Sequence, residues 1–162
     1  MCENGSLQEK SIQVFTLPPV ACDWLCITTN AMINRSGRAA MGRGIALAAK
    51  RAVRNCDFTL GRMLAQKGNH VYQFASWHNI RLFAFPTKTD WKLPSSLSLI
   101  EQSCQELRDL WDASLPKPRV FLPRPGCCNG GLNYEHQVRP LLLQYFGHVP
   151  YRDFFTIIDL PQ

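Results

Sequence analysis

With 162 residues, 46% of them apolar and 19% charged, the chain is long enough to bury one core and has the composition of a folded protein. It has no run of about 18 apolar residues and no basic-then-apolar start, so neither a membrane span nor a signal peptide is expected. The net charge of +6 favours a polyanionic partner, nucleic acid or nucleotide, although a role in solubility alone stays open. The densest part of this charge consists of Arg35, Arg38, Arg43, Lys50, Arg51 and Arg54.

Seven cysteines and four histidines bear on the redox compartment and on metal binding. The cysteines are odd in number and lack CxxC spacing, which is typical of reduced thiols in a cytoplasmic protein rather than of a disulfide framework. No histidine lies three to five residues from another, so neither a zinc site nor any other cofactor is expected. The cysteines are Cys2, Cys22, Cys26, Cys56, Cys104, Cys127 and Cys128.

The first half of the chain alternates strand and helix patterns. Residues 1–11 are polar and predicted to be loose, and a first strand is predicted at 12–15. The near-continuous apolar run 24–30 is typical of a strand buried on both faces of a mostly parallel sheet. A glycine-rich loop at 34–44 then leads into a helix, predicted from the helical spacing of Ile45, Ala48, Ala49, Ala52 and Val53.

The second half continues this alternation. A short helix at 60–66 is followed by strands at 71–75 and 80–85 and by a long helix that begins at Pro94 or the serines after it. A strand at 120–122, a helix with Pro140 in its first turn, and a strand at 154–158 complete the chain. We therefore predict one domain over residues 1–162, a three-layer α/β/α sandwich with a central mixed β-sheet.

Two glycine loops of this chain precede helices. Gly42 and Gly44 lie in the first loop, and Gly126, Gly130 and Gly131 lie in the second. Backbone N–H groups at a helix N-terminus attract anions, and glycine lets a ligand approach the backbone. Neither a P-loop nor a dinucleotide fingerprint is present in the first loop, because its glycines are not followed by Lys-Ser/Thr or by a third glycine. Together the two loops could hold a diphosphate, and ordinary turns are the alternative.

Four segments resemble those of macrodomains in order and spacing. They are Ile27-Thr-Thr-Asn30, Gly42-Arg-Gly-Ile-Ala46, Phe85-Pro-Thr-Lys88 and Pro123-Arg-Pro-Gly-Cys-Cys-Asn-Gly-Gly131. Macrodomains are ADP-ribose-binding α/β/α modules, and the resemblance covers residues 20–160. Within the family, the chain resembles the branch that includes the DarG-type antitoxins and the terminal ADP-ribose glycohydrolases. Many relatives in this branch are bacterial or phage proteins, and the resemblance implies such an origin here.

The resemblance implies a role for individual residues. Asn30 would contact the distal ribose and Lys88 would take part in catalysis, so these two form the predicted catalytic set. The two glycine loops would surround the diphosphate. The predicted ligand-binding residues are Thr29, Asn30, Gly42, Arg43, Gly44, Ile45, Pro86, Thr87, Gly126, Cys127, Cys128, Asn129, Gly130, Gly131 and Leu132.

Two departures from the family pattern stand out. The adenine-binding aspartate of many macrodomains has no counterpart beside Thr16-Leu-Pro-Pro19, so backbone groups and stacking on Phe154 or Phe155 are expected to hold adenine. The catalytic aspartate of the eukaryotic glycohydrolases would fall at Gly130, where the DarG-like pattern also has glycine. Asp90 is the carboxylate nearest to Lys88 in the sequence, and a surface-loop role is the alternative for it.

The resemblance therefore implies an ADP-ribose-binding domain that hydrolyses the glycosidic bond of ADP-ribosylated DNA, at thymidine, or of ADP-ribosylated protein through Lys88. One alternative is a non-catalytic ADP-ribose reader. Another is an enzyme that processes ADP-ribose 1″-phosphate or O-acetyl-ADP-ribose. The expected partner is ADP-ribose or an ADP-ribosylated macromolecule, with DNA as a candidate. We expect a monomer without membrane contact.

Overall fold

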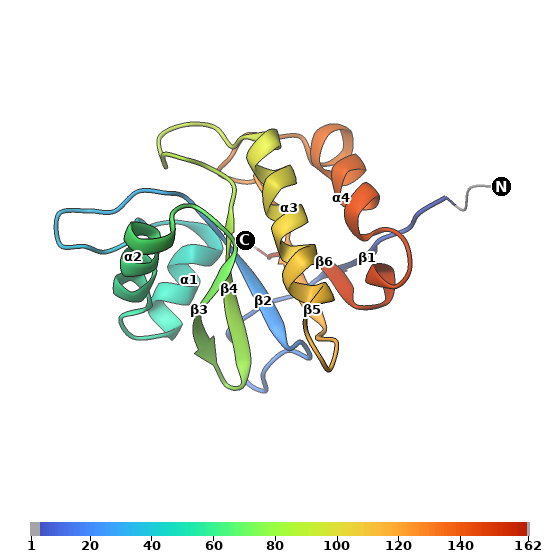
Figure 1. Cartoon of the computed structure of the whole chain (residues 1–162), viewed down its shortest axis with the longest axis horizontal. Coiled ribbons are helices and arrows are strands. Elements are labelled where there is room, and N and C mark those ends of the chain that lie inside the picture. Colours follow the sequence, from blue (N-terminus) through green and yellow to red (C-terminus); the bar gives the residue numbers. More distant parts are fainter. Residues whose placement is uncertain (1–3, 162) are drawn as a thin grey trace.

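The computed structural model describes residues 4–161, which form one mixed sheet with the strand order β1-β6-β5-β2-β4-β3 (Figure 1). Every neighbouring pair of strands is parallel except β3 and β4. The strands are β1 (Gln8–Ser11), β2 (Trp24–Thr29), β3 (Tyr72–Trp77), β4 (Ile80–Pro86), β5 (Val120–Pro123) and β6 (Phe155–Asp159).

Helices cover both faces of the sheet. Helices α1 (Gly44–Ala52) and α2 (Cys56–Lys67) lie on one face, and α3 (Leu97–Asp112) and α4 (Arg139–Phe146) lie on the other (Figure 1). A π-helical turn, η1 (Tyr134–Val138), leads into α4, and a 3-10 turn, η2 (Tyr151–Asp153), precedes β6. This arrangement confirms the predicted three-layer α/β/α sandwich with a central mixed sheet.

Strand β2 separates two hydrophobic cores, because successive side chains of a strand point to opposite faces. Leu25 and Ile27 pack in the core under α1 and α2, together with Ala49. Trp24 and Cys26 pack in the core under α3 and α4. All four of these β2 side chains are buried, which accounts for the near-continuous apolar run in the sequence.

The first strand lies earlier in the chain than predicted. Residues 8–11 form β1, which pairs with β6, whereas residues 12–15 form no strand and contribute only one further bond, from the Ile12 N–H to the Asp159 carbonyl (3.0 Å). The prediction of a loose segment over 1–11 is therefore wrong for residues 8–11. All four residues of β1 are exposed and polar, so this edge strand has no apolar pattern that periodicity could detect.

The cysteines within residues 4–161 are free thiols, and Cys2 lies outside the described residues. Burial raises the pKa of the Cys22 thiol to about 12 and that of Cys56 to about 11. These buried thiols are therefore protonated and unreactive at neutral pH. In the described part of the chain, every helix is too short or too polar to cross a bilayer.

A carboxylate on β1 ties this edge strand to the segment that follows the second glycine loop. Glu9 accepts hydrogen bonds from the Tyr134 hydroxyl (2.6 Å) and from two nitrogens of the Arg139 guanidinium (2.9 and 3.0 Å). Burial acts to raise the pKa of Glu9, but these hydrogen bonds outweigh it and hold the pKa below its usual value of 4.5. Glu9 thereby connects the N-terminal strand to η1 and α4.

We predict that Glu9→Gln lowers the free energy of unfolding at pH 7 by about 1 kcal/mol. Because the pKa of Glu9 is lower in the folded chain than in the unfolded chain, the ionised form stabilises the fold above about pH 4.5 and this contribution is lost as the pH falls through the folded pKa. Urea unfolding from pH 7 to pH 3 should therefore show the difference between variant and wild type shrinking in acid. Glu135→Gln, at an exposed carboxylate, is the control, and an equal pH profile for both variants would contradict the assignment.

Candidate functional site

The carboxyl ends of three parallel strands meet at one edge of the sheet. Thr29 at the end of β2 is paired with Pro86 at the end of β4, and β5 ends beside them at Pro123. At this edge lies a cavity of about 470 Å³, which is within the usual size range of small-molecule sites. It is lined by residues 28–30, 34, 39–46, 87–88, 91, 95, 123–124 and 126–130, together with Lys50 and Leu160. Open α/β sheets bind ligands at such an edge.

The first glycine loop presents the N-terminus of α1 to this cavity. The helix begins at Gly44, Arg43 precedes it in an extended conformation, and no side chain caps the free backbone N–H groups. No acidic residue lies in the first turn, so the positive end of the helix dipole is not neutralised there. Gly42, Arg43, Gly44 and Ile45 all line the cavity, as the sequence predicts for an anion site.

Asn30 holds this loop in place. Its side-chain nitrogen donates to the Ala40 carbonyl (3.1 Å), and its side-chain oxygen accepts from the Met32 N–H (2.9 Å). An amide side chain can donate twice and accept twice, so one donor and one acceptor site remain for a ligand. Asn30 therefore lines the cavity and also organises the loop around it.

The second glycine loop is packed tightly against the start of α3. Gly126 and Gly131 have positive φ angles of 77° and 75°, and the Leu132 N–H donates to the Gly126 carbonyl (2.9 Å). A Cβ atom on Gly130 would collide with the Ser95 hydroxyl and with the Gly126 carbonyl. An aspartate cannot occupy position 130 without moving this loop, so the catalytic aspartate of the eukaryotic glycohydrolases has no counterpart here.

Both loops and the predicted catalytic lysine converge on Asn129. The ammonium group of Lys88 donates to the Asn129 carbonyl (2.9 Å). The side-chain nitrogen of Asn129 lies 3.3 Å from the position that a Cβ on Gly44 would take. The loop after β4, the loop after β5 and the start of α1 are thus in direct contact around the cavity.

Two buried hydroxyl groups in the lining have no hydrogen-bond partner within residues 4–161. They belong to Thr29 and Ser95, which are 6% and 8% exposed. An unpaired buried polar atom costs free energy, and native proteins tolerate few of them. Their oxygen atoms have almost no exposed surface, so these hydroxyls lie behind the wall and are not free groups of the cavity surface.

No family model and no curated protein matches the sequence. Among solved structures, the macrodomain of Mycobacterium tuberculosis DarG has a TM-score of 0.71 and 25% identity, over 96% of this chain and 99% of that one. The fold is that of a DarG-like macrodomain. The macrodomain of Thermus aquaticus DarG has a TM-score of 0.71 and 23% identity, over 97% and 99% of the two chains. Thermosipho africanus DarTG in complex with ADP-ribose has a TM-score of 0.66 and 22% identity, over 86% of this chain but only 38% of that one.

Most of the predicted site residues lie in the cavity wall, and three do not. Pro86 is buried beneath it, where its carbonyl accepts from the Ser103 hydroxyl (2.7 Å). Leu132 packs with the core under α3 and α4, and Gly131 is exposed outside the lining. Those in the wall are Thr29, Asn30, Gly42, Arg43, Gly44, Ile45, Thr87, Lys88, Gly126, Cys127, Cys128, Asn129 and Gly130.

Phe154 and Phe155 cannot stack on a ligand in this cavity. Phe155 is paired with Val120 at the amino end of β5, so it lies at the amino ends of the parallel strands, whereas the cavity lies at their carboxyl ends. It is 1% exposed and stacks on Phe146 with a centroid distance of 4.4 Å, while Phe154 packs against Trp111. The prediction that either ring holds adenine is therefore wrong.

Sequence reasoning missed several residues of the wall. Leu160 follows β6 and Arg124 follows β5, so the rule that ligands bind beyond the carboxyl ends of strands could have found both. Ser95 reaches the wall only through its tertiary contact with the second glycine loop, which no local pattern signals. Trp91 was not missed, since the sequence offers it for stacking on a nucleobase, with packing on the following helix as the alternative; it is half exposed and lines the cavity.

Cys127 of the second loop is not poised as a nucleophile. Burial raises the pKa of the Cys127 thiol to about 11, and its sulfur donates to the Pro125 carbonyl (3.3 Å). A thiol in this state is not a thiolate at neutral pH. Cys127 and Cys128 both line the cavity.

We predict that Gly130→Ala lowers the free energy of unfolding by about 2 kcal/mol, because the added methyl group collides with Ser95 and Gly126. Gly42→Ala is the matched control, since a Cβ there meets no atom within 4 Å and the change should stay within about 0.5 kcal/mol. Urea unfolding of both variants measures the difference. Equal stabilities would show that the second loop is not tightly packed.

Proposed function

We propose that this macrodomain binds ADP-ribose and removes it from ADP-ribosylated DNA or protein. The observation that carries this proposal is the convergence of two glycine loops and Lys88 on one cavity. The complex of Thermosipho africanus DarTG with ADP-ribose supports the choice of ligand. The predicted binding and catalytic residues remain proposals that the experiments below test.

The charge of the cavity wall suits a diphosphate. Its lining contains four cationic side chains, of Arg43, Lys50, Lys88 and Arg124, and no carboxylate. The uncapped N-terminus of α1 adds backbone donors at the same place. A nucleoside diphosphate sugar supplies two negative charges that match this wall.

The lack of carboxylates in the lining also bears on the chemistry. Ordinary glycosidases use a pair of carboxylates on either side of the scissile bond, and this wall offers none. Asp90 lies outside the lining, and its side-chain oxygen accepts from the Lys92 N–H (2.9 Å), so it serves the loop. Lys88 is the side chain in the wall that suits proton transfer or nucleophilic attack.

Two contacts fix the position of Lys88. It is the second residue after β4, its ammonium donates to the Asn129 carbonyl (2.9 Å), and its own carbonyl accepts from the Asn69 side chain (3.1 Å). Positive charge there would stabilise the departing group as an oxocarbenium-like centre forms on the distal ribose. Alternatively, the deprotonated amine would attack the anomeric carbon, the bond to the base or carboxylate would break with a proton passing to that leaving group, and the ribose ring would open to an imine that water hydrolyses to free ADP-ribose and the amine. Reduction with borohydride during turnover distinguishes the two routes, since only an imine leaves a permanent adduct on Lys88.

We predict that Gly42→Val weakens ADP-ribose binding at least about tenfold without unfolding the domain. A side chain at Gly42 extends into open space at the cavity wall, and the φ angle there is not in the left-handed region. Gly44 is a poorer position for this test, because its φ of 57° would strain any branched residue. Calorimetry with ADP-ribose, ADP and NAD measures binding, and thermal unfolding monitors the fold. Unchanged affinity would place the ligand away from the first loop.

We predict that Lys88→Ala abolishes release of ADP-ribose from a modified substrate while the affinity for free ADP-ribose changes less than about threefold. Lys92→Ala is the matched control, because that lysine lies on the same loop but outside the lining. Release is measured on thymidine-linked and on glutamate-linked ADP-ribose. If Lys88→Ala still releases ADP-ribose, Lys88 is not catalytic. If the wild type binds ADP-ribose but releases none from either substrate, the protein is a non-catalytic reader.

A further inference from the structure

Asn69 lies outside the cavity wall but contacts the backbone of Lys88. It belongs to the turn between α2 and β3, and its side-chain nitrogen donates to the Lys88 carbonyl (3.1 Å). Within residues 4–161, Lys88 forms one other hydrogen bond, from its ammonium to the Asn129 carbonyl (2.9 Å). The two ends of this lysine are therefore held by two different parts of the chain.

The backbone of Lys88 is held differently from that of its neighbours. The carbonyls of Thr87 and Thr89 accept from backbone N–H groups, at 2.9 and 3.3 Å. The Lys88 carbonyl between them accepts from a side chain instead. The orientation of the peptide group that follows Lys88 thus depends on the Asn69 amide.

The turn that contains Asn69 does not require an asparagine there. Gly68, with a φ of 82°, supplies the left-handed conformation of this turn, and its N–H donates to the Leu64 carbonyl at the end of α2. Asn69 is not among the residues with a positive φ. Among the described residues, the only hydrogen bond of its side chain is the one to Lys88.

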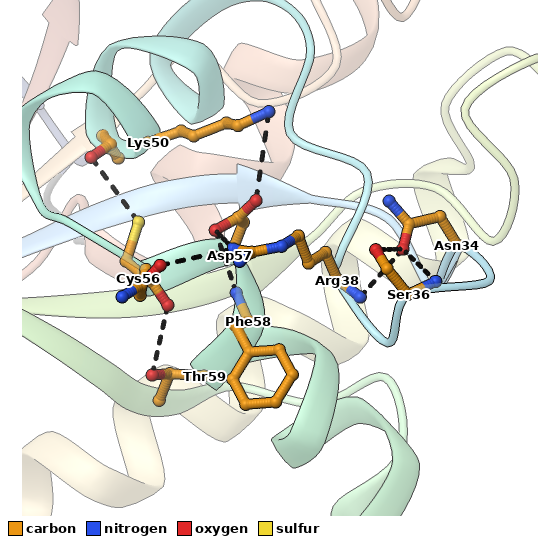
Figure 2. Close-up of polar contacts among 10 residues, drawn as sticks. Asn34, Ser36, Arg38, Lys50, Cys56, Asp57, Phe58 and Thr59 are labelled. Atoms are coloured by element: carbon orange, nitrogen blue, oxygen red, sulfur yellow. Dashed lines mark hydrogen bonds and ion pairs between the residues drawn. The ribbon is translucent and has the colours of Figure 1, made fainter.

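Asn34, in the cavity wall, shows the contrasting case of an asparagine that organises its own loop. Its side-chain oxygen accepts from the Ser36 N–H (3.1 Å), the Ser36 hydroxyl (2.7 Å) and the Arg38 N–H (3.0 Å) (Figure 2). The side-chain oxygen of Asn69 is buried and has no partner within residues 4–161. An unpaired buried acceptor costs free energy, so the stability of the turn does not account for Asn69.

We propose that Asn69 is a positioning residue for the amine of Lys88. This inference rests on the proposed function, because it assigns a role in the reaction of Lys88. Lysine carries its ammonium on a flexible four-carbon stem, so a contact at the ammonium alone does not fix how the amine approaches a substrate. The bond from Asn69 fixes the other end of the residue. Misplacement of a reacting group by about 1 Å can lower a rate about a hundredfold.

We predict that Asn69→Leu lowers kcat for ADP-ribose release about tenfold, while KM and the Kd for free ADP-ribose change less than about twofold. Leucine has nearly the shape of asparagine but no donor. It removes the unpaired oxygen of Asn69 and leaves the Lys88 carbonyl unpaired instead, so the melting temperature should fall by no more than about 2 °C. Asn69→Ala removes the same donor with a smaller side chain and should cause the same loss of kcat.

Tyr72→Phe is the matched control. The Tyr72 hydroxyl donates to the Gly68 carbonyl (2.9 Å), so this variant loses one hydrogen bond at the same turn and keeps the contact between Asn69 and Lys88. Its kcat should equal that of the wild type. A kcat of Asn69→Leu within about twofold of the wild type, or an equal loss of kcat in Tyr72→Phe, would overturn the proposal.

Hydrogen exchange distinguishes failure of this proposal from failure of the proposed function. Loss of the bond to Lys88 should speed exchange of the amides in residues 87–90 about tenfold in Asn69→Leu and not in Tyr72→Phe, and this measurement needs no substrate. Unchanged exchange in Asn69→Leu would show that Asn69 does not hold Lys88. A wild type that releases no ADP-ribose, with faster exchange in Asn69→Leu, would instead overturn the proposed function and with it the role in catalysis.

Discussion

Parallel pairing of β2 with both β4 and β5 is the constraint on which the site depends. It brings Asn30, Thr87 and Arg124, each of which directly follows one of these strands, to a single edge of the sheet. Backbone hydrogen bonding fixes the ends of these three strands relative to one another, so the loops that follow the strands all begin at this edge. The side chains of β2 are buried on both faces, so a slip in register would exchange them between the two cores and disrupt the packing of both.

The glycines of the two loops serve different physical purposes. Gly130 is glycine because the Ser95 hydroxyl and the Gly126 carbonyl occupy the space of a side chain, whereas Gly42 meets open space at the cavity wall. The first case is a requirement of packing within the protein, and the second leaves room for a ligand. Glycine is therefore present at these two positions for different physical reasons. Only the atoms around each glycine show which reason applies.

Local patterns were enough to predict the strand–helix alternation and most of the cavity wall. Glycine loops after apolar strands indicated the anion site, since that signal lies within one short segment. The polar strand β1 was missed because its pairing with β6 depends on backbone groups and not on apolar side chains. Phe155 was misplaced because the direction and register of β6 decide which edge it occupies, and neither can be deduced from an apolar run.

Asn129 links the two halves of the site through different atoms. Its carbonyl holds the ammonium of Lys88, and its amide nitrogen lies beside Gly44 at the start of α1. Any shift of the second loop therefore moves the lysine and the wall of the anion site together. A phosphate that draws the loop N–H groups toward itself would also reposition Lys88. If a diphosphate binds as proposed, its binding and the placement of the amine would therefore be coupled through Asn129, which lies 41 residues from Lys88 in the chain.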